Sequence, residues 1–210
     1  MSDPFVPRIY GMPDSGNCYK PCLLMDLIGR PYEWRPVDAL GGETRSPAFL
    51  AINPAGRVPV LEYAPGVFLA ESNAILWFLG HDSPLWPGED PERAAVLAWM
   101  FFEQNSHEVW IATSRFRLMF AGARPDAEDI LSRREPGMKA LALMERHLGE
   151  HEWFGASGAS LADVALYAYT HVADEGGFPL GEFPGIGAWL SRVAGLPGFR
   201  PMRRGEAPGG

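Results

Sequence analysis

Apolar and polar residues alternate differently in the two parts of the chain. Over about the first 80 residues, short apolar runs bounded by Gly, Pro and Asn alternate with apolar residues at helical spacing, which is the pattern of short strands interleaved with helices. The order predicted is strand, helix, strand, helix, a two-stranded hairpin and a helix, over residues 6–11, 17–29, 31–39, 46–56, 57–71 and 72–80. We therefore expect a small α/β domain over residues 1–82.

Longer helical patterns follow residues 81–91, a stretch rich in Pro, Gly and Asp that has the composition of a linker. The helices predicted after it run from Pro91 to about Phe120 and over residues 126–151, 160–176 and 183–199. Ser160 and Asp163 predict a capping box, in which the serine accepts from the third helical N–H and the aspartate reaches back. The simplest partition adds an all-helical domain over residues 91–210.

Composition and charge narrow the function classes. Of the 210 residues, 47% are hydrophobic and 21% charged, which is ordinary globular usage. A net charge of -8 repels phosphate backbones, so we expect no nucleic-acid ligand. No apolar stretch reaches the length of a membrane span, and the first ten residues lack the pattern of a secretory signal. Two cysteines make no disulfide framework and fit a reducing cytosol, so we expect a cytoplasmic protein.

Candidate chemistry gathers where the first strand gives way to the first helix, at Ser15, Asn17 and Cys18. A helix N-terminus carries unpaired N–H groups and partial positive charge, so it favours an anion. The Ser15 hydroxyl and the Asn17 amide could each donate one more hydrogen bond to that anion. A simple N-cap role for Ser15 is the alternative at this point.

The two cysteines argue against a dithiol mechanism. Ser15 and Cys18 form S-x-x-C, in which serine stands where the C-x-x-C motif of thiol oxidoreductases has its nucleophile. Cys22 follows Cys18 by four residues, a spacing poorly oriented for a disulfide within one helix. The thiolate is therefore expected from a substrate, with Cys18 either a small buried hydrophobe or a second contributor at the site.

Four segments, taken in order, resemble the motifs of the cytosolic glutathione transferase family: "YGMPDSGNCYK", "NPAGRVPVLE", "LAESNAILWFL" and "GASLADVALYAYT". The first resembles the catalytic segment of bacterial, serine-type members. The resemblance covers nearly the whole chain and implies an α/β thioredoxin-like N-terminal domain plus an all-α C-terminal helical bundle. It also implies a homodimer that uses glutathione as co-substrate and needs no metal.

The resemblance assigns roles to individual residues. It places the hydroxyl of Ser15 against the glutathione sulfur, with the Asn17 amide near the same atom. In another bacterial class a cysteine lies nearby in this loop, so Cys18 stays a candidate. Which of the three stabilises the thiolate is left open.

The same resemblance implies how the rest of glutathione is held. The Val58 backbone would pair with the cysteinyl part, before a cis peptide bond at Pro59. Glu71 and Ser72 would hold the γ-glutamyl group, and Arg57 would reach the glycyl carboxylate. These residue types fit the charges of glutathione, because a carboxylate side chain can pair with an ammonium and a cationic side chain with a carboxylate.

The electrophile site is expected on the long helix after the linker. Phe102, Ser106 and Trp110 could share one face of that helix and contact the electrophile, although helix or dimer packing explains each of them as well. His107 could reach the electrophile site, but a position at the surface is the simpler expectation. His147 and His151 have the spacing of two metal ligands, but no third ligand is evident, so no metal is expected.

The function implied is a transferase in which the glutathione thiolate attacks a small apolar electrophile, as in detoxification. Two alternatives stay open. One is a glutathione-dependent reductase, isomerase or dehalogenase on the same fold. The other is a non-catalytic interaction module, because one fold hosts many functions.

Overall fold

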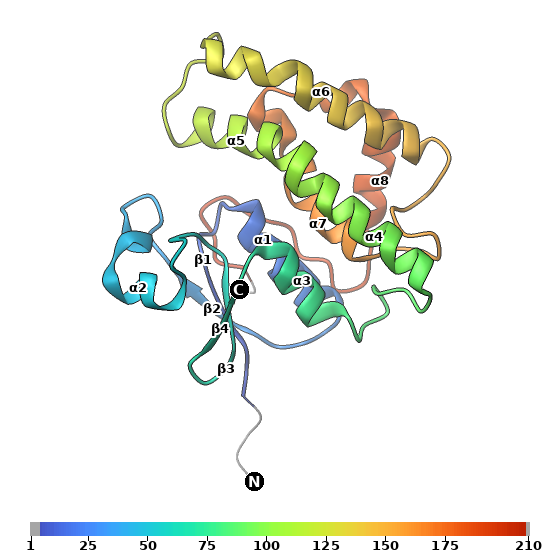
Figure 1. The fold of residues 1–210 in the computed structure, drawn as a ribbon. Coiled ribbons are helices and arrows are strands. Elements are labelled where there is room, and N and C mark those ends of the chain that lie inside the picture. Colours follow the sequence, from blue (N-terminus) through green and yellow to red (C-terminus); the bar gives the residue numbers. More distant parts are fainter. Residues whose placement is uncertain (1–4, 209–210) are drawn as a thin grey trace. The chain divides into compact units, whose positions relative to one another are not determined.

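The computed structural model describes residues 5–208 (Figure 1). The chain divides into two compact units, one running up to Ser83 and including the chain from Leu196 onward, the other being Pro84–Gly195. Every strand among the described residues lies in the first unit, and the second is built of helices. The predicted change of character after the first 80 residues is therefore present in the structure.

A four-stranded sheet forms the centre of the first unit, with the order β2-β1-β3-β4. Its strands are β1 (Arg8–Gly11), β2 (Glu33–Pro36), β3 (Val60–Ala64) and β4 (Val67–Ala70). β1 and β2 run parallel, whereas β3 is antiparallel to both β1 and β4. The helices are α1 (Gly16–Leu27), α2 (Pro47–Ile52) and α3 (Ser72–Gly80), with a 3₁₀ turn at Glu43–Arg45. This is the predicted element order, and it confirms the thioredoxin-like fold.

Helix α1 is buried over most of its length and packs against α3. Leu23 and Leu24 of α1 and Ile75 and Leu76 of α3 are completely buried. Burying such side chains contributes roughly 1.5–3 kcal/mol each. Pro21 lies inside α1 without ending it, since only the carbonyl four residues earlier loses its helical donor.

Helices α4 (Asp90–Phe102) and α5 (Glu108–Met119) occupy the segment for which one long helix was predicted. A π-helical turn at Glu103–His107 joins them, so the prediction of one regular helix was wrong in detail. A π-turn closes hydrogen bonds one residue later than an α-turn, and periodicity alone gives no signal for it. The turn contains His107, which is completely buried rather than at the surface, and its Nε2 lies 3.0 Å from Thr170 Oγ1.

The remaining helices of this unit are α6 (Glu128–Leu148), α7 (Leu161–Thr170) and α8 (Pro184–Ala194), with 3₁₀ turns at Ala173–Gly176 and Leu180–Glu182. The predicted capping box at the start of α7 is confirmed. Asp163 is 1% exposed and accepts from the Ser160 backbone N–H at 2.8 Å and the Trp189 indole N–H at 2.9 Å. This carboxylate therefore joins the start of α7 to α8.

The tail after α8 packs on the first unit. The partition expected from the sequence assigned it to the helical domain, but the Tyr19 hydroxyl donates to the Arg200 carbonyl at 2.6 Å and the Gly205 N–H donates to Asp14 Oδ1 at 2.9 Å. Gly198 has φ +83, and a Cβ there would collide with the carbonyl oxygen of Asp26. A segment without apolar periodicity carries no local signal of the surface it will contact.

Candidate active site

Strand register brings the expected binding segments to one end of the sheet. Tyr10 pairs with Val60, and Val60 pairs with Ala70. The residues that follow β1 and β4 and the residues that precede β3 therefore lie at the same end of the sheet. This end of the sheet holds the loop that leads to Ser15, the Val58–Pro59 pair and Glu71. Sequence motifs alone could not establish that these segments lie together.

Ser15 is the N-cap of α1, with φ -89 and ψ 118, and its Oγ accepts from the Cys18 N–H at 3.3 Å. The side chain is half-buried. Gly11 allows the tight path before it, because a Cβ there would lie 2.6 Å from the Trp34 ring and 2.9 Å from Cys18 Sγ. A small residue at the end of β1 is thus required to seat the first turn of α1 against the sheet.

Cys18 is completely buried, and burial raises the pKa of its thiol to about 11. Hydrogen bonds from the Ser15 hydroxyl and the Met12 backbone N–H oppose this rise without cancelling it. Burial likewise holds the pKa of the Cys22 thiol well above its usual value. Both cysteines are therefore neutral near pH 7, and buried neutral thiols are poor nucleophiles. This geometry favours a thiolate brought by a ligand.

The Val58–Pro59 peptide bond is cis, as the resemblance implied. The preceding turn is held by Asn53, whose Nδ2 donates to the Arg57 carbonyl at 2.7 Å and whose Oδ1 accepts from the Ala55 N–H at 3.1 Å. Val58 is half-buried and the Arg57 side chain is exposed. The backbone of Val58 thus lies just before the start of β3, where an extended peptide could pair with it.

Glu71 and Ser72 form the junction between β4 and α3. Glu71 has φ +70, a left-handed value that is uncommon outside glycine and costs about 1–3 kcal/mol. Ser72 is 5% exposed, and its Oγ donates to Asn17 Oδ1 at 3.0 Å. Asn17, which is expected near the glutathione sulfur, is therefore directly hydrogen-bonded to Ser72, which is expected at the γ-glutamyl group.

Lys20 extends this contact and was missed by the sequence reasoning. Its Nζ donates to Ser72 Oγ at 3.3 Å, and its side chain is completely buried. The sequence feature that could have indicated its burial is a lysine among apolar residues of one helix. Its neighbours Tyr19, Cys22 and Leu23 are all buried. Lysine is almost never fully buried unless it is paired.

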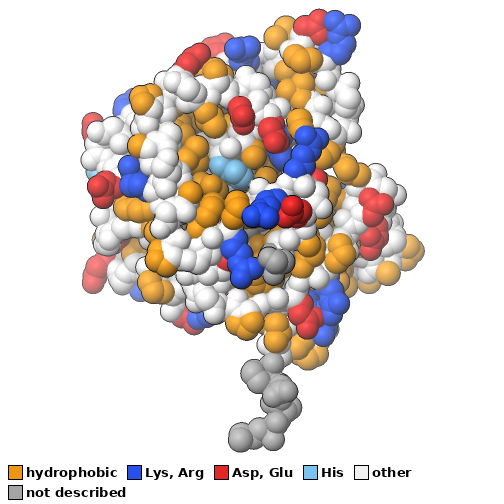
Figure 2. Space-filling view, turned by 180° about the vertical axis from the view of Figure 1, so that it is seen from behind, with side chains coloured by type: hydrophobic (Ala, Val, Ile, Leu, Met, Phe, Trp, Pro, Cys, Tyr) orange, Lys and Arg blue, Asp and Glu red, His pale blue; other side chains and the backbone are white. Residues whose placement is uncertain are grey.

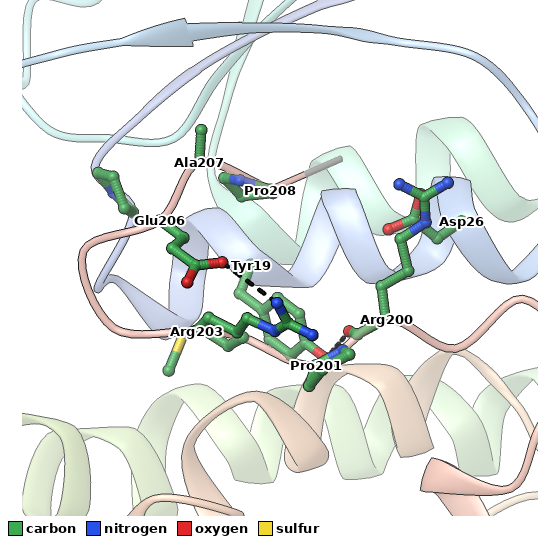
Figure 3. Close-up of a pocket in the computed structure, with 10 residues that line it drawn as sticks. Tyr19, Asp26, Arg200, Pro201, Arg203, Glu206, Ala207 and Pro208 are labelled. Atoms are coloured by element: carbon green, nitrogen blue, oxygen red, sulfur yellow. Dashed lines mark hydrogen bonds and ion pairs between the residues drawn. The ribbon is translucent and has the colours of Figure 1, made fainter. Parts of the chain in front are cut away.

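A separate cavity of about 260 Å³ lies between α1 and the tail (Figure 3). Its charged side chains face one another, with Arg200 Nε 3.7 Å from Asp26 and Arg203 Nη1 3.6 Å from Glu206. Pro13 is the lining residue nearest in sequence to Ser15. Paired charges leave little reason for an anion to bind there, so we do not place the site in this cavity.

In the helical unit, Phe102, Ser106 and Trp110 are all half-buried. Phe102 ends α4, Ser106 lies in the π-helical turn and Trp110 is in α5. Their role in binding an electrophile stays a prediction.

Within residues 5–208, no group of three or more His, Cys, Asp or Glu side chains is arranged to hold a metal ion. His147 and His151 have ring centroids 4.4 Å apart, and His147 Nε2 lies 3.0 Å from the Trp153 carbonyl oxygen. The described helices include none that is both long and apolar enough to cross a membrane.

Basic and acidic side chains are interspersed on the face drawn in Figure 2. Several of the arginines form ion pairs in the structure, among them Arg30 with Asp82 at 2.9 Å and Arg124 with Asp126 at 2.6 Å.

Two family models match the chain. "Glutathione S-transferase, N-terminal domain" matches residues 9–88, and "Glutathione S-transferase, C-terminal domain" matches residues 109–197.

Individual proteins agree with these matches. The crystal structure of a glutathione S-transferase from Pseudomonas fluorescens Pf-5 is 49% identical with a TM-score of 0.91, covering 94% of this chain and 99% of that one. A possible glutathione S-transferase from Rhodopseudomonas palustris is 46% identical with a TM-score of 0.90, covering 94% and 98%. Maleylacetoacetate isomerase from Pseudomonas aeruginosa is 30% identical, covering 96% of this chain and 97% of its own.

Proposed function

The chain belongs to the glutathione S-transferase family, and from this premise we propose that it is a serine-type transferase of bacterial kind. In this proposal Ser15 and the N-terminus of α1 hold glutathione as a thiolate, which attacks a small apolar electrophile. The observation that carries the proposal is the half-buried N-cap Ser15, which follows β1 at the same end of the sheet as Val58 and Glu71. Such chemistry serves detoxification.

The energy required is within reach of these groups. A free thiol has a pKa near 8.5, and lowering it by ~2 units takes about 2.7 kcal/mol of differential interaction. A charge-assisted hydrogen bond supplies roughly 1.5–3 kcal/mol, and a helix N-terminus about 0.3–1 kcal/mol. Ser15 together with α1 is therefore sufficient without a metal or a general base, and Asn17 is an additional donor.

The rest of the tripeptide has a partner at each charged group. The Val58 backbone next to cis-Pro59 suits the cysteinyl part, and Ser72 at the start of α3 suits the γ-glutamyl carboxylate. Glu71 suits the ammonium of the same group, and Arg57 the glycyl carboxylate.

Calorimetric titration with glutathione, followed by assays with a chloronitrobenzene and with a mixed disulfide, tests the proposal. We expect saturable binding and conjugation of the aryl chloride. The absence of glutathione binding would overturn it. Binding without turnover of either substrate would overturn conjugation and leave an isomerase or a non-catalytic module.

Glutathione-dependent isomerisation is a second candidate, favoured by the 30% identity to maleylacetoacetate isomerase over nearly the whole chain. The same thiolate would add to a cis double bond and leave again after rotation, so glutathione would be regenerated. Isomerisation of a cis-enone substrate with no net consumption of glutathione would distinguish this reaction from conjugation.

We also propose a cytoplasmic homodimer. Both cysteines are free, which fits a reducing compartment. Tyr63, Val67 and Trp77 of β3, β4 and α3 are 36%, 42% and 44% exposed, and a contiguous patch of such side chains would mark an interaction surface. Light scattering should give a dimer for the wild type and a smaller species for Trp77→Glu. A monomeric wild type would contradict this.

A further inference from the structure

Lys20 carries a positive charge into the interior of the first unit. It is completely buried, and its Nζ lies 3.3 Å from Ser72 Oγ. Ser72 Oγ in turn lies 3.0 Å from Asn17 Oδ1. The three polar groups come from α1 and from the first residue of α3, so they connect the helix that carries Ser15 with the helix that follows Glu71.

The chemistry of these groups restricts the directions of their hydrogen bonds. An ammonium has only donors, so it must take a lone pair of the Ser72 oxygen. The hydroxyl proton of Ser72 then goes to Asn17 Oδ1, as the structure shows. With its oxygen held in this way, the Asn17 amide has its N–H groups at the end opposite Ser72.

We propose that Lys20 is a positioning residue of the glutathione site, acting through Ser72 on the Asn17 amide. The inference rests on the proposed function, in which the N–H groups of Asn17 help to stabilise the thiolate. Lys20 takes one of the two lone pairs of the Ser72 oxygen, and without Lys20 both lone pairs are open to a donor. The amide can then rotate, donate to Ser72 and turn its oxygen towards the sulfur, which repels a thiolate.

The first test replaces Lys20 by Met, which has similar length and no donors. Lys139→Met is the matched control, since Lys139 is the other lysine of the chain and is exposed on α6. We expect Lys20→Met to weaken glutathione binding about tenfold and to raise the apparent pKa of the bound thiol. Lys139→Met should change neither quantity. Wild-type binding and an unchanged pH profile in Lys20→Met would overturn the inference.

The second test is a double-mutant cycle with Asn17→Ala. If Lys20 acts through Asn17, Lys20→Met raises the thiol pKa in the wild-type background but has no further effect once Asn17 is Ala. A merely structural role would give additive effects, and that result would overturn the inference. Should Lys20→Met fail to fold, Ser72→Ala breaks the same relay and the same non-additivity with Asn17→Ala is required of it.

Lys20→Gln separates the donor from the charge. Glutamine keeps an N–H that can donate to Ser72, so it should restore a pKa close to that of the wild type, and a loss equal to that of Met would overturn positioning by hydrogen bonding. The outcomes also separate the two proposals. A wild-type protein that fails to bind glutathione removes the proposed function, whereas normal wild-type binding with an indifferent Lys20 removes only this inference.

Discussion

Helices α1 and α7 both begin with a serine N-cap, and the residue three positions later is Cys18 in α1 and Asp163 in α7. In α7 the cap is closed. Asp163 accepts from the Ser160 N–H and hydroxyl at 2.8 and 2.9 Å, and from the Phe154 N–H at 3.1 Å. A carboxylate of the chain itself thus occupies the positive end of this helix.

In α1 the corresponding position is filled by a neutral thiol, and the first turn contains no acidic residue. Ser15 is half-buried, whereas Ser160 is 2% exposed. The positive end of α1 is therefore compensated by no side chain of its own first turn, and an external anion can fill that role. The comparison shows how one cap motif stabilises the fold in one helix and suits a ligand in another.

The largest expected effect comes from breaking the closed cap. Asp163→Ala leaves several buried donors without an acceptor, including the Trp189 indole N–H, and each such group costs about 1–3 kcal/mol. We expect the free energy of unfolding, measured in urea, to fall by about 3 kcal/mol or more. Asp126→Ala, at an exposed carboxylate, is the control. A loss no larger than that of the control would contradict the closed cap.

Breaking the cap of α1 should affect catalysis more than stability. Ser15→Ala removes a charge-assisted hydrogen bond of roughly 1.5–3 kcal/mol, so kcat/KM should fall about 10- to 100-fold. The kinetic pKa of bound glutathione should rise, because the thiolate loses a donor. Ser160→Ala removes an equivalent cap and should lower stability by about 1 kcal/mol with the pH–rate profile unchanged. An unchanged profile in Ser15→Ala would shift the role to Asn17 or Cys18.

The thiol at the third position of α1 makes a smaller, pH-dependent contribution. Burial raises the pKa of Cys18 from 9.0 to about 11, so the folded state favours the protonated thiol. Its contribution to the free energy of unfolding is complete below pH 9 and is lost as the pH rises towards 11. The loss amounts to about 1 kcal/mol by pH 10. Thermal unfolding at several pH values should show this slope in the wild type and less of it in Cys18→Ala.

The same variant sharpens the assignment at neutral pH. Because the Cys18 thiol is neutral there, Cys18→Ala should keep the wild-type kinetic pKa for glutathione. A large change in that pKa would mean that Cys18 takes part in stabilising the thiolate.

The features that the sequence by itself determined are those that depend on local interactions. The order of strands and helices, the S-x-x-D box of α7 and the serine at the start of α1 depend on periodicity and on contacts within a few residues. Such signals depend on neighbouring residues, so the order of elements and the candidate Ser15 could be predicted from the residues themselves. The fold family and the other candidate binding residues were implied by the resemblance to glutathione transferases.

Tertiary structure alone decided three other features. The hydrogen bonds from Lys20 to Ser72 and on to Asn17 join residues more than 50 positions apart. The π-helical turn of Glu103–His107 interrupts a pattern that looked like one helix, and His107 is buried there. Each depends on which distant side chains meet in the packed interior, where a buried polar group must find its partner. No local pattern of the sequence encodes that meeting.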